Sequence, residues 1–559
     1  MKKFLFLILF VVLILPTLWQ ALLPGYFAMH DDLQVMRLFQ MEKCLQDGQV
    51  PCRWAPDMAY GYGQPMFNFY SAFPYYLGGF THLVTSLSLI DTVKALFIIA
   101  ILFSGLGMFL LSKKFFGFWG GLVSAIFYVY APYHALDLYV RGAVSESFSL
   151  MLLPILWLTI YEVIKNPKTK WILSLSATLA ALLSTHNVST MLYVIPSALW
   201  AIFWLFVERK NFIKSIISLA IGGALGVSIA SFFIIPVFVE KNFIQSEFLT
   251  VNYLNYQNHF VSLRQLFLER KWGYGPSIFG DTDDISFQLG IVHWIASGIV
   301  GLLVFRKLVK KEFEIKVFMV SLLLFLAGFA SFMTHAKSLF IWQSLESTLA
   351  FVQFPWRFLG LSIFFMSFAA GYIIPKTRII KQYFAMTLIF LSIALNYSYF
   401  TPLYYFPQDT DQSKLSGESF IIQSKAAILD YLPKTAKQDP HSQAGKPSVA
   451  AGDGEISNFI VRSNFFFFDA QMYHDGTVDI PVTYYPGWEV VDVDKLIPSR
   501  PDGILGTIYI DLSEGKHLIK GRFRETPLRQ TANIITLVGF GIFLVIFIKG
   551  DTIDKRWLS

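Results

Sequence analysis

Two adjacent aspartates, Asp31 and Asp32, stand a few residues beyond the first long apolar stretch of the chain, residues 4–23. Neighbouring carboxylates raise one another's pKa, so such a pair suits a general base or a site that faces a metal ion. The residues that follow have a helical apolar pattern, which predicts an interfacial amphipathic helix with the acids at or near its N-terminus. A helix cap is the alternative, because acids at that position satisfy free N–H groups and the helix dipole.

A loop rich in glycine and aromatic residues lies beyond this helix, at residues 53–65, and contains Tyr60 and Tyr62. Such a loop can present ring faces and polar edges to a ligand, as carbohydrate-binding sites do. Aromatic belts at a bilayer surface have a similar composition, so composition alone does not separate the two interpretations.

The only two cysteines of the chain, Cys44 and Cys52, lie between the acids and the aromatic loop. In an oxidising compartment a disulfide between them would hold the loop together. Two unpaired thiols are the alternative. A metal site is not indicated, because two thiols without histidines at ligand spacing are too few ligands.

Charged residues at the ends of apolar stretches are candidates for binding an anionic group. Arg141 follows one such stretch, and its alternative role is an i, i+4 ion pair with Asp137. Arg357 stands at a membrane edge, where an ionisable residue is functional by default unless its side chain snorkels to the surface.

Two further candidates lie at other outer positions. His186 ends an apolar stretch and suits either a phosphate or sugar contact or a polar contact at a helix end. Arg264 belongs with Arg270 and Lys271 to a group that suits a mobile clamp or the binding of lipid headgroups.

Composition predicts a polytopic membrane protein. Of the 559 residues, 55% are hydrophobic and only 15% are charged, with a mean hydropathy of +0.52, whereas soluble domains carry about a quarter charged residues. The net charge of +7 does not indicate nucleic-acid binding, because the lysines and arginines fall in short runs between apolar segments. Such runs orient helices by the positive-inside rule.

About twelve transmembrane helices are expected from apolar stretches long enough to cross a bilayer. The segment 74–90 is short and interrupted by polar residues, so it is predicted to be an interfacial helix. The basic runs then share one side, which predicts cytoplasmic termini and an uncleaved signal anchor at the start. The expected spans are 4–23, 93–112, 116–135, 147–164, 170–186, 188–207, 213–238, 288–306, 316–334, 357–374, 381–400 and 530–548.

Two long outer loops, 24–92 and 239–287, separate some of these spans, and a third outer segment is larger still. In that segment, residues 401–529, short alternating runs between turn signals, the first of them at 456–468, predict the strands of a small β-sandwich after a polar, flexible stretch at 409–455. We therefore expect an all-α multi-span domain over 1–400, an outer β-rich domain over 401–529, and a last span with a cytoplasmic tail over 530–559.

Several motifs in order resemble a known family of large bacterial and archaeal membrane proteins, labelled 6-pyruvoyl-tetrahydropterin synthase-related. The ten histidines do not form the zinc-binding cluster that the pterin label implies. The matching motifs are His30-Asp31-Asp32, residues 53–63, 67–70 and 74–80, 139–143 with Glu146, 185–187, 272–275, 288–290, 354–358 and 484–488.

The expected architecture is in turn similar to that of GT-C glycosyltransferases, which carry an acidic residue or pair just after their first helix. By that resemblance the chain is an enzyme of the cytoplasmic membrane. It would transfer a sugar from a polyprenyl-phosphate-linked donor to a glycan, lipid or protein acceptor on the outer face, with Asp31 or Asp32 as base. The residues expected to bind the donor phosphate or sugar are Arg141, Arg357, His186, Glu146, Arg264, Tyr60 and Tyr62.

Two functions of other classes remain as alternatives. A lipid-linked glycan transporter or flippase would show paired broken helices and charges at mid-span, whereas these charges concentrate at span ends. A non-catalytic assembly factor for cell-envelope glycans would use the β-domain as its binding module. No cofactor is assigned with certainty; a divalent cation beside the acids stays open, because no ligand set can be assembled from the sequence.

Overall fold

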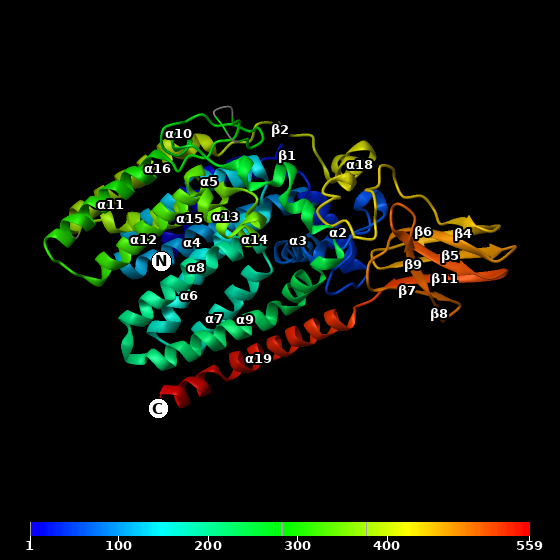
Figure 1. The fold of residues 1–559 in the computed structure, drawn as a ribbon. Coiled ribbons are helices and arrows are strands. Elements are labelled where there is room, and N and C mark those ends of the chain that lie inside the picture. The colour runs from blue at the N-terminus through cyan, green and yellow to red at the C-terminus, as the bar shows by residue number, and fades with distance from the viewer. Residues whose placement is uncertain (1, 279, 281–282, 376, 559) are drawn as a thin grey trace.

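The computed structural model describes residues 2–278, 280, 283–375 and 377–558. Helices dominate up to residue 425, strands dominate residues 448–523, and one long helix, α19 (Pro527–Leu558), ends the chain. In Figure 1 the strands of residues 448–523 form the right-hand end of the molecule, and both termini lie toward the other end of the helical part. The predicted combination of apolar helices with a small β region is thereby confirmed.

The expected count of about twelve spans is not confirmed, because eight helices among the described residues are both long and apolar enough to cross a bilayer. Two shorter apolar stretches, Ile8–Leu22 and Thr169–Leu183, lie in α1 (Lys2–Leu18) with the turn after it and in α7 (Thr169–Leu183). The long apolar helices are α4 (Leu89–Val129), α6 (Val144–Lys165), α8 (Asn187–Val207), α9 (Phe212–Glu240), α11 (Ile291–Val309), α12 (Ile315–Met333), α15 (Leu359–Ala370) with its flanking turns, and α19.

One reason for the different count is that α4 contains two of the expected spans. Gly117 interrupts the helix with φ 72° and ψ −172°, a conformation open to glycine. The hydroxyls of Ser112 and Ser124 are hydrogen-bonded at 2.7 Å, whereas twelve residues of straight helix would separate them by about 18 Å. The chain therefore reverses at Gly117, and the two halves of α4 lie side by side.

The segment after the first helix carries α2 (Gln34–Gln46) and α3 (Phe73–Thr85), which pack against each other and against α4. The prediction that α2 lies on a surface is wrong, because Gln34, Arg37 and Gln40 of its polar face are buried. They are stabilised there by side-chain partners; the amide of Gln40, for example, donates to Asp57 at 2.7 Å. The remaining short helices are α5 (Pro132–Ala135), α10 (Leu263–Phe267), α13 (Leu339–Ser344) and α14 (Glu346–Leu349), and α16 is Arg378–Asn396.

The β region consists of two antiparallel sheets with strand orders β3-β6-β10-β9 and β4-β5-β11-β7-β8. Alternate residues of β5, from Phe466 to Met472, are buried and share one apolar core with Val478 and Ile480 of β6 in the other sheet. The strands are β3 (Ser448–Ala451), β4 (Gly454–Val461), β5 (Phe465–Met472), β6 (Gly476–Thr483), β7 (Trp488–Asp492), β8 (Lys495–Ile497), β9 (Ser499–Asp502), β10 (Thr507–Leu512) and β11 (Gly515–Phe523).

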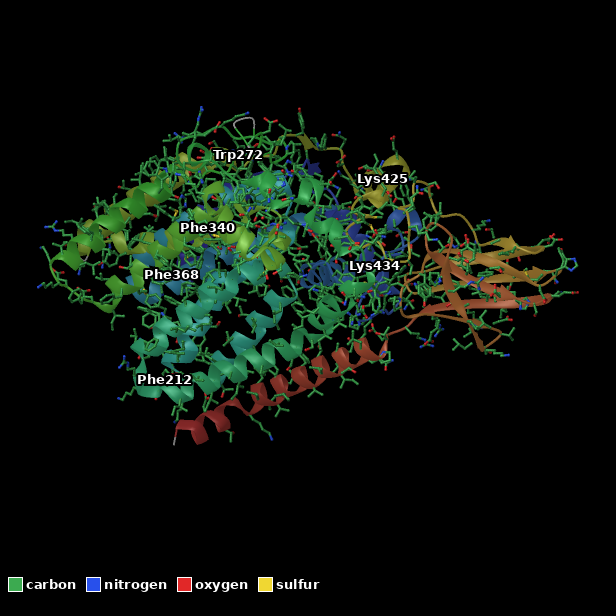
Figure 2. All side chains as sticks on the ribbon, in the orientation of Figure 1. Phe212, Trp272, Phe340, Phe368, Lys425 and Lys434 are labelled. Atoms are coloured by element: carbon green, nitrogen blue, oxygen red, sulfur yellow. A yellow bond between two sulfur atoms is a disulfide. The ribbon has the colours of Figure 1, made fainter. Side chains whose placement is uncertain are left out.

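Two details of this region differ from expectation. The run predicted as one strand over 456–468 divides into β4 and β5, and the stretch predicted to be flexible contains α17 (Asp411–Lys414) and α18 (Gly417–Lys425). Lys425 and Lys434 lie where the helical part meets the sheets (Figure 2). A separate pair of two-residue strands, β1 (Tyr26–Phe27) and β2 (Tyr405–Phe406), joins the start of the chain to this segment.

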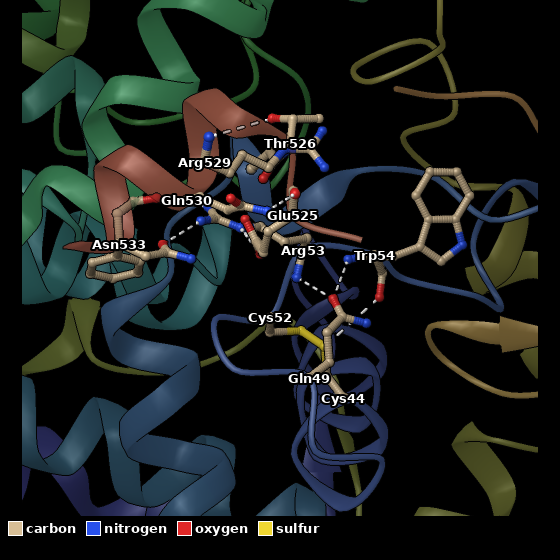
Figure 3. A network of polar contacts seen from close by, with 12 residues as sticks. Cys44, Gln49, Cys52, Arg53, Trp54, Glu525, Thr526, Arg529, Gln530 and Asn533 are labelled. Carbon is tan, nitrogen blue, oxygen red and sulfur yellow. Dashed lines mark hydrogen bonds and ion pairs between the residues drawn. A yellow bond between two sulfur atoms is a disulfide. The ribbon is translucent and has the colours of Figure 1, made fainter. Parts of the chain in front are cut away.

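Ion pairs of two buried arginines fasten α19 and the segment just before it to the 53–65 loop and to α9; Figure 3 shows the contacts of Arg53. The guanidinium of Arg53, 1% exposed, contacts Glu525 at 3.1 Å and donates to Asn533 of α19 at 3.0 Å. Arg529 of α19 likewise pairs with Glu240 of α9 at 2.8 Å. A buried charge is costly unless it is paired, so these contacts hold α9, α19 and the 53–65 loop in one arrangement.

Candidate functional site

The two aspartates precede α2, but neither caps it. The N-cap position is Leu33, with no side-chain hydrogen bond to the free backbone N–H groups of the first turn. Instead, each carboxylate binds a different cation. The helix-cap interpretation therefore does not account for the pair.

Asp31 balances a buried arginine of α2. Its Oδ2 atom accepts hydrogen bonds from Arg37 at 2.6 Å and from Gln34 at 3.0 Å. The Arg37 side chain is only 6% exposed and lies 4.2 Å from the centre of the Tyr70 ring. An unpaired guanidinium would be costly at this buried position, so Asp31 stabilises the fold by neutralising Arg37. The same contact fixes the position of its carboxylate.

Asp32 is held more loosely and by a residue far along the chain. Its Oδ2 accepts from the ammonium of Lys414, 382 residues later, at 2.8 Å. Its Oδ1 is buried and has no hydrogen-bond partner among the described residues, although the side chain as a whole is 41% exposed. Burial raises the pKa of Asp32, and the charge of Lys414 opposes that rise.

Lys414 comes from α17, within the stretch that was expected to be flexible. Besides Asp32, its ammonium lies 3.6 Å from Asp409 and 5.1 Å from the centre of the Tyr26 ring. The Lys414 side chain is 12% exposed. Sequence reasoning missed it, because a single lysine in a polar stretch carries no signal that it will meet Asp32.

A third carboxylate, that of Asp430, belongs to the segment that follows α18. Burial raises the pKa of Asp430 to about 6, with the charge of Arg37 lowering it and that of Asp31 raising it. The next residue, Tyr431, stacks on Phe69 with ring centres 6.2 Å apart. Asp430 therefore lies within the electrostatic field of the Asp31–Arg37 pair, and it too was not a candidate from the sequence.

A second group of buried charges lies close to the two aspartates, and backbone hydrogen bonds connect the two regions. The N–H of His30 donates to Val140 at 2.8 Å, and the N–H of Asp31 donates to the carbonyl of Arg141 at 3.0 Å. Arg141 ends a π-helical turn, Leu136–Arg141, between α5 and α6. These bonds tie the backbone of the aspartates to that of the buried group.

We call Asp137, Arg141, Glu146 and Arg357 the buried ion cluster. Arg141 donates to Asp137 and, at 2.7 Å, to Glu146 in the first turn of α6. Arg357 lies in the turn Pro355–Phe358 before α15, with its Nε 3.6 Å from the same Glu146 carboxylate. The i, i+4 pair of Arg141 with Asp137 is thus present, and a phosphate-binding role for either arginine stays a prediction.

His186 stands beside this cluster at the N-cap of α8. Its Nδ1 accepts from the N–H of Ser189 at 3.3 Å and lies 2.7 Å from the Ser189 hydroxyl. The charges of Glu146, Arg357 and Arg141 all act on its imidazole. The polar helix-end contact expected for His186 is present, and the ring remains close to the cluster.

The other predicted binding residues lie elsewhere. The carbonyls of Tyr60 and Tyr62 accept hydrogen bonds from Ala444 and Thr483, both at 2.9 Å, so the aromatic loop contacts both the segment before the sheets and the end of β6. Arg264 is exposed on α10 and has no ion pair within the described ranges. The structure therefore groups Arg141, Arg357, Glu146 and His186 and separates them from the two tyrosines.

Cys44 and Cys52 form a disulfide, which closes the turn between α2 and Arg53. Within the part of the chain that the structure describes, no group of three or more histidine, cysteine, aspartate or glutamate side chains is arranged to hold a metal ion.

Comparisons with known proteins confirm the family resemblance. Residues 67–339 match the family described as "6-pyruvoyl-tetrahydropterin synthase related domain; membrane protein". No curated protein matches the sequence. Among solved structures, the chain is similar to the mycobacterial arabinofuranosyltransferase AftD and to its R1389S mutant, with 14% identity and a TM-score of 0.42 in both cases. Each similarity covers 72% of this chain but only 27% and 29% of the AftD chains.

Proposed function

We propose that this chain, whose residues 67–339 match the 6-pyruvoyl-tetrahydropterin synthase-related membrane family, is a glycosyltransferase of the cytoplasmic membrane. It would move a sugar from a polyprenyl-phosphate-linked donor to an acceptor hydroxyl on the outer face, with Asp32 as general base. The observation that carries the proposal is the state of the Asp32 carboxylate. One of its oxygens contacts Lys414 at 2.8 Å, and the other is buried with no partner among the described residues.

Asp32 suits the role of base better than Asp31 does. A general base must be able to take up a proton near neutral pH, and burial raises the pKa of Asp32 toward that range. Asp31 instead accepts two hydrogen bonds on one oxygen and neutralises Arg37. Protonating Asp31 would leave that buried guanidinium without a counter-charge.

In the proposed reaction, Asp32 removes the proton of the acceptor hydroxyl as its oxygen attacks the anomeric carbon. The bond from that carbon to the phosphate oxygen breaks, and the lipid phosphate leaves with the electron pair. The leaving phosphate carries negative charge, so nearby cations stabilise it. Lys414 is the nearest cation to the base. Arg141 and Arg357 are the next candidates for contacting the leaving phosphate, and each would then divide its contacts between the phosphate and Glu146.

The test is a transfer assay on purified protein in lipid nanodiscs, with a panel of polyprenyl-phosphate-linked sugars and release of polyprenyl phosphate as readout. Asp32→Asn should lower the rate by about 100-fold or more, the usual contribution of a general base. Glu418→Gln, on exposed α18 and with no ion pair among the described residues, is the matched control and should retain full activity. Full activity of Asp32→Asn, with unchanged size-exclusion behaviour, would exclude Asp32 as base.

A further inference from the structure

An apolar groove lies along α12, far from Asp32 along the chain, and is lined mainly by α12 and α10. It has a volume of about 450 Å³, and the surface of its lining is almost entirely apolar. α11 and α15 contribute one side chain each. The lining residues are Leu263, Leu266 and Phe267 of α10, Ser297 of α11, Leu324, Ala327, Gly328, Ser331 and Phe332 of α12, His335 and Lys337 after it, and Met366 of α15.

The polar residues of the groove include a histidine and a lysine just beyond the C-terminal end of α12. His335 accepts the N–H of Lys337 on its Nδ1 at 3.0 Å, so the neutral ring carries its proton on Nε2 and can donate it to a ligand. Lys337 is exposed and has no ion pair within the described ranges. None of the twelve lining residues is a carboxylate.

Arg264 adds a second unpaired cation at the same end. It is exposed on α10, directly after Leu263 of the lining. The surface around it is apolar: Leu263 is 53% exposed and Leu268 is 74% exposed. An apolar channel with unpaired cations at one end complements a molecule with a hydrocarbon chain and an anionic headgroup.

We propose that this groove binds an anionic glycerophospholipid of the bilayer, with one acyl chain along α12 beside α10 and the phosphate beside Lys337 and His335. α11 and α12 lie in contact with each other. The groove faces the surface that a bilayer would cover, since Phe325 and Phe329 of α12 are 64% and 43% exposed. The charge of the site favours an anionic headgroup, because a zwitterionic lipid has no net negative charge to attract Lys337 and Arg264.

The site is distinct from the proposed transferase centre. Its lining includes none of Asp31, Asp32 and Lys414, and no residue of the buried ion cluster. It also contains neither a carboxylate nor a tryptophan or tyrosine, the side chains by which a sugar would be held. These features favour a structural phospholipid over the sugar-linked donor.

Gly328 offers a sharp way to close the groove. A Cβ atom added at this position would meet no atom within 4 Å, so a tryptophan can be attached there without displacing the helix backbone, and its ring then competes with a ligand for the groove. Gly298 of α11 has the same freedom and does not line the groove. Gly298→Trp is therefore a matched control for Gly328→Trp in size, helix context and exposure.

The experiment is native mass spectrometry of delipidated protein in detergent, titrated separately with dioleoyl-phosphatidylglycerol, dioleoyl-phosphatidylcholine and undecaprenyl phosphate. Phosphatidylglycerol should bind about fivefold or more tightly than phosphatidylcholine, as expected for about 1 kcal/mol per basic residue near an anionic group. Lys337→Gln should reduce that preference. Gly328→Trp should abolish the tightest phosphatidylglycerol binding, and Gly298→Trp should not.

Two outcomes would overturn the proposal. Unchanged phosphatidylglycerol binding by Gly328→Trp would show that the groove is not the site. Stronger binding of undecaprenyl phosphate than of phosphatidylglycerol, lost in Gly328→Trp, would assign the groove to the carrier lipid of the transfer reaction. Loss of transfer in Asp32→Asn has no bearing on either result, so the two proposals fail separately.

Discussion

Replacing Lys414 with methionine should raise the pKa of Asp32, because the ammonium stabilises the charged carboxylate. At their separation of 2.8 Å, two unit charges interact by about 1.5 kcal/mol in a water-like dielectric. The Asp32 side chain is 41% exposed, and ion pairs at exposed positions contribute about 1 kcal/mol or less when measured. One pKa unit corresponds to about 1.36 kcal/mol, so we expect an upward shift of about 0.7 unit or less.

An infrared titration measures this shift without any substrate. The protonated carboxyl of Asp32 absorbs separately from its carboxylate, and the band that is missing in Asp32→Asn identifies it. Titrating the detergent-purified wild type and Lys414→Met over pH 3–9 then gives the midpoint of each. Lys425→Met, which removes an exposed charge of α18 with no ion pair in the described part of the chain, is the control.

An unchanged midpoint in Lys414→Met, or an equal shift in Lys425→Met, would refute the assignment of Lys414 as the partner of Asp32. If the transfer reaction is as proposed, its rate has an acid limb at the same pKa, since only the deprotonated base accepts a proton. That limb should move to higher pH in Lys414→Met by the same amount. A rate loss at every pH without such a displacement would indicate that Lys414 acts only through folding.

Two further predictions concern stability, both measured by thermal unfolding in detergent. Burial raises the pKa of Asp430 to about 6 from about 3.9 in the unfolded chain, so its contribution to stability is complete below pH 4 and is lost as the pH rises through 6. Asp430→Asn should therefore be more stable than the wild type above pH 7, by up to about 3 kcal/mol, and equally stable near pH 4; a constant difference would contradict this. Replacing Cys44 and Cys52 by alanine should cost about 2–3 kcal/mol from the freed nine-residue loop, and a reductant should lower the unfolding temperature of the wild type but not of the variant.

The helices were predictable because their signal is local. An apolar run of about twenty residues identifies a membrane helix from its own composition, and each stretch expected to span lies on a helix of the structure. The turn inside α4 also has a local signal, since Lys113 and Lys114 interrupt the apolar run shortly before Gly117. The strands followed from period-two alternation, although the break between β4 and β5 at residues 462–464 was missed.

The burial of α2 was not predictable, because it depends on partners elsewhere in the chain. From helical periodicity alone, its polar residues are predicted to form a face that is exposed to water. In the structure, Gln40 meets Asp57 and Gln34 meets Tyr75, and these contacts make a polar face compatible with burial. Periodicity identifies which residues share a face, but it does not say whether that face meets water or buried polar groups.

The same limit explains why the two aspartates could not be told apart from the sequence. They are adjacent, and their difference arises from Arg37 in one case and from Lys414 in the other. Arg37 is buried and depends on Asp31, so a change at Asp31 disturbs the fold as well as the site. Lys414 comes from the segment that precedes the sheets, so the state of Asp32 depends on how that segment sits against α2. A change that displaces α17 should therefore alter the protonation of Asp32 while leaving the Asp31–Arg37 pair intact, which links the segment before the sheets to the proposed chemistry through one ion pair.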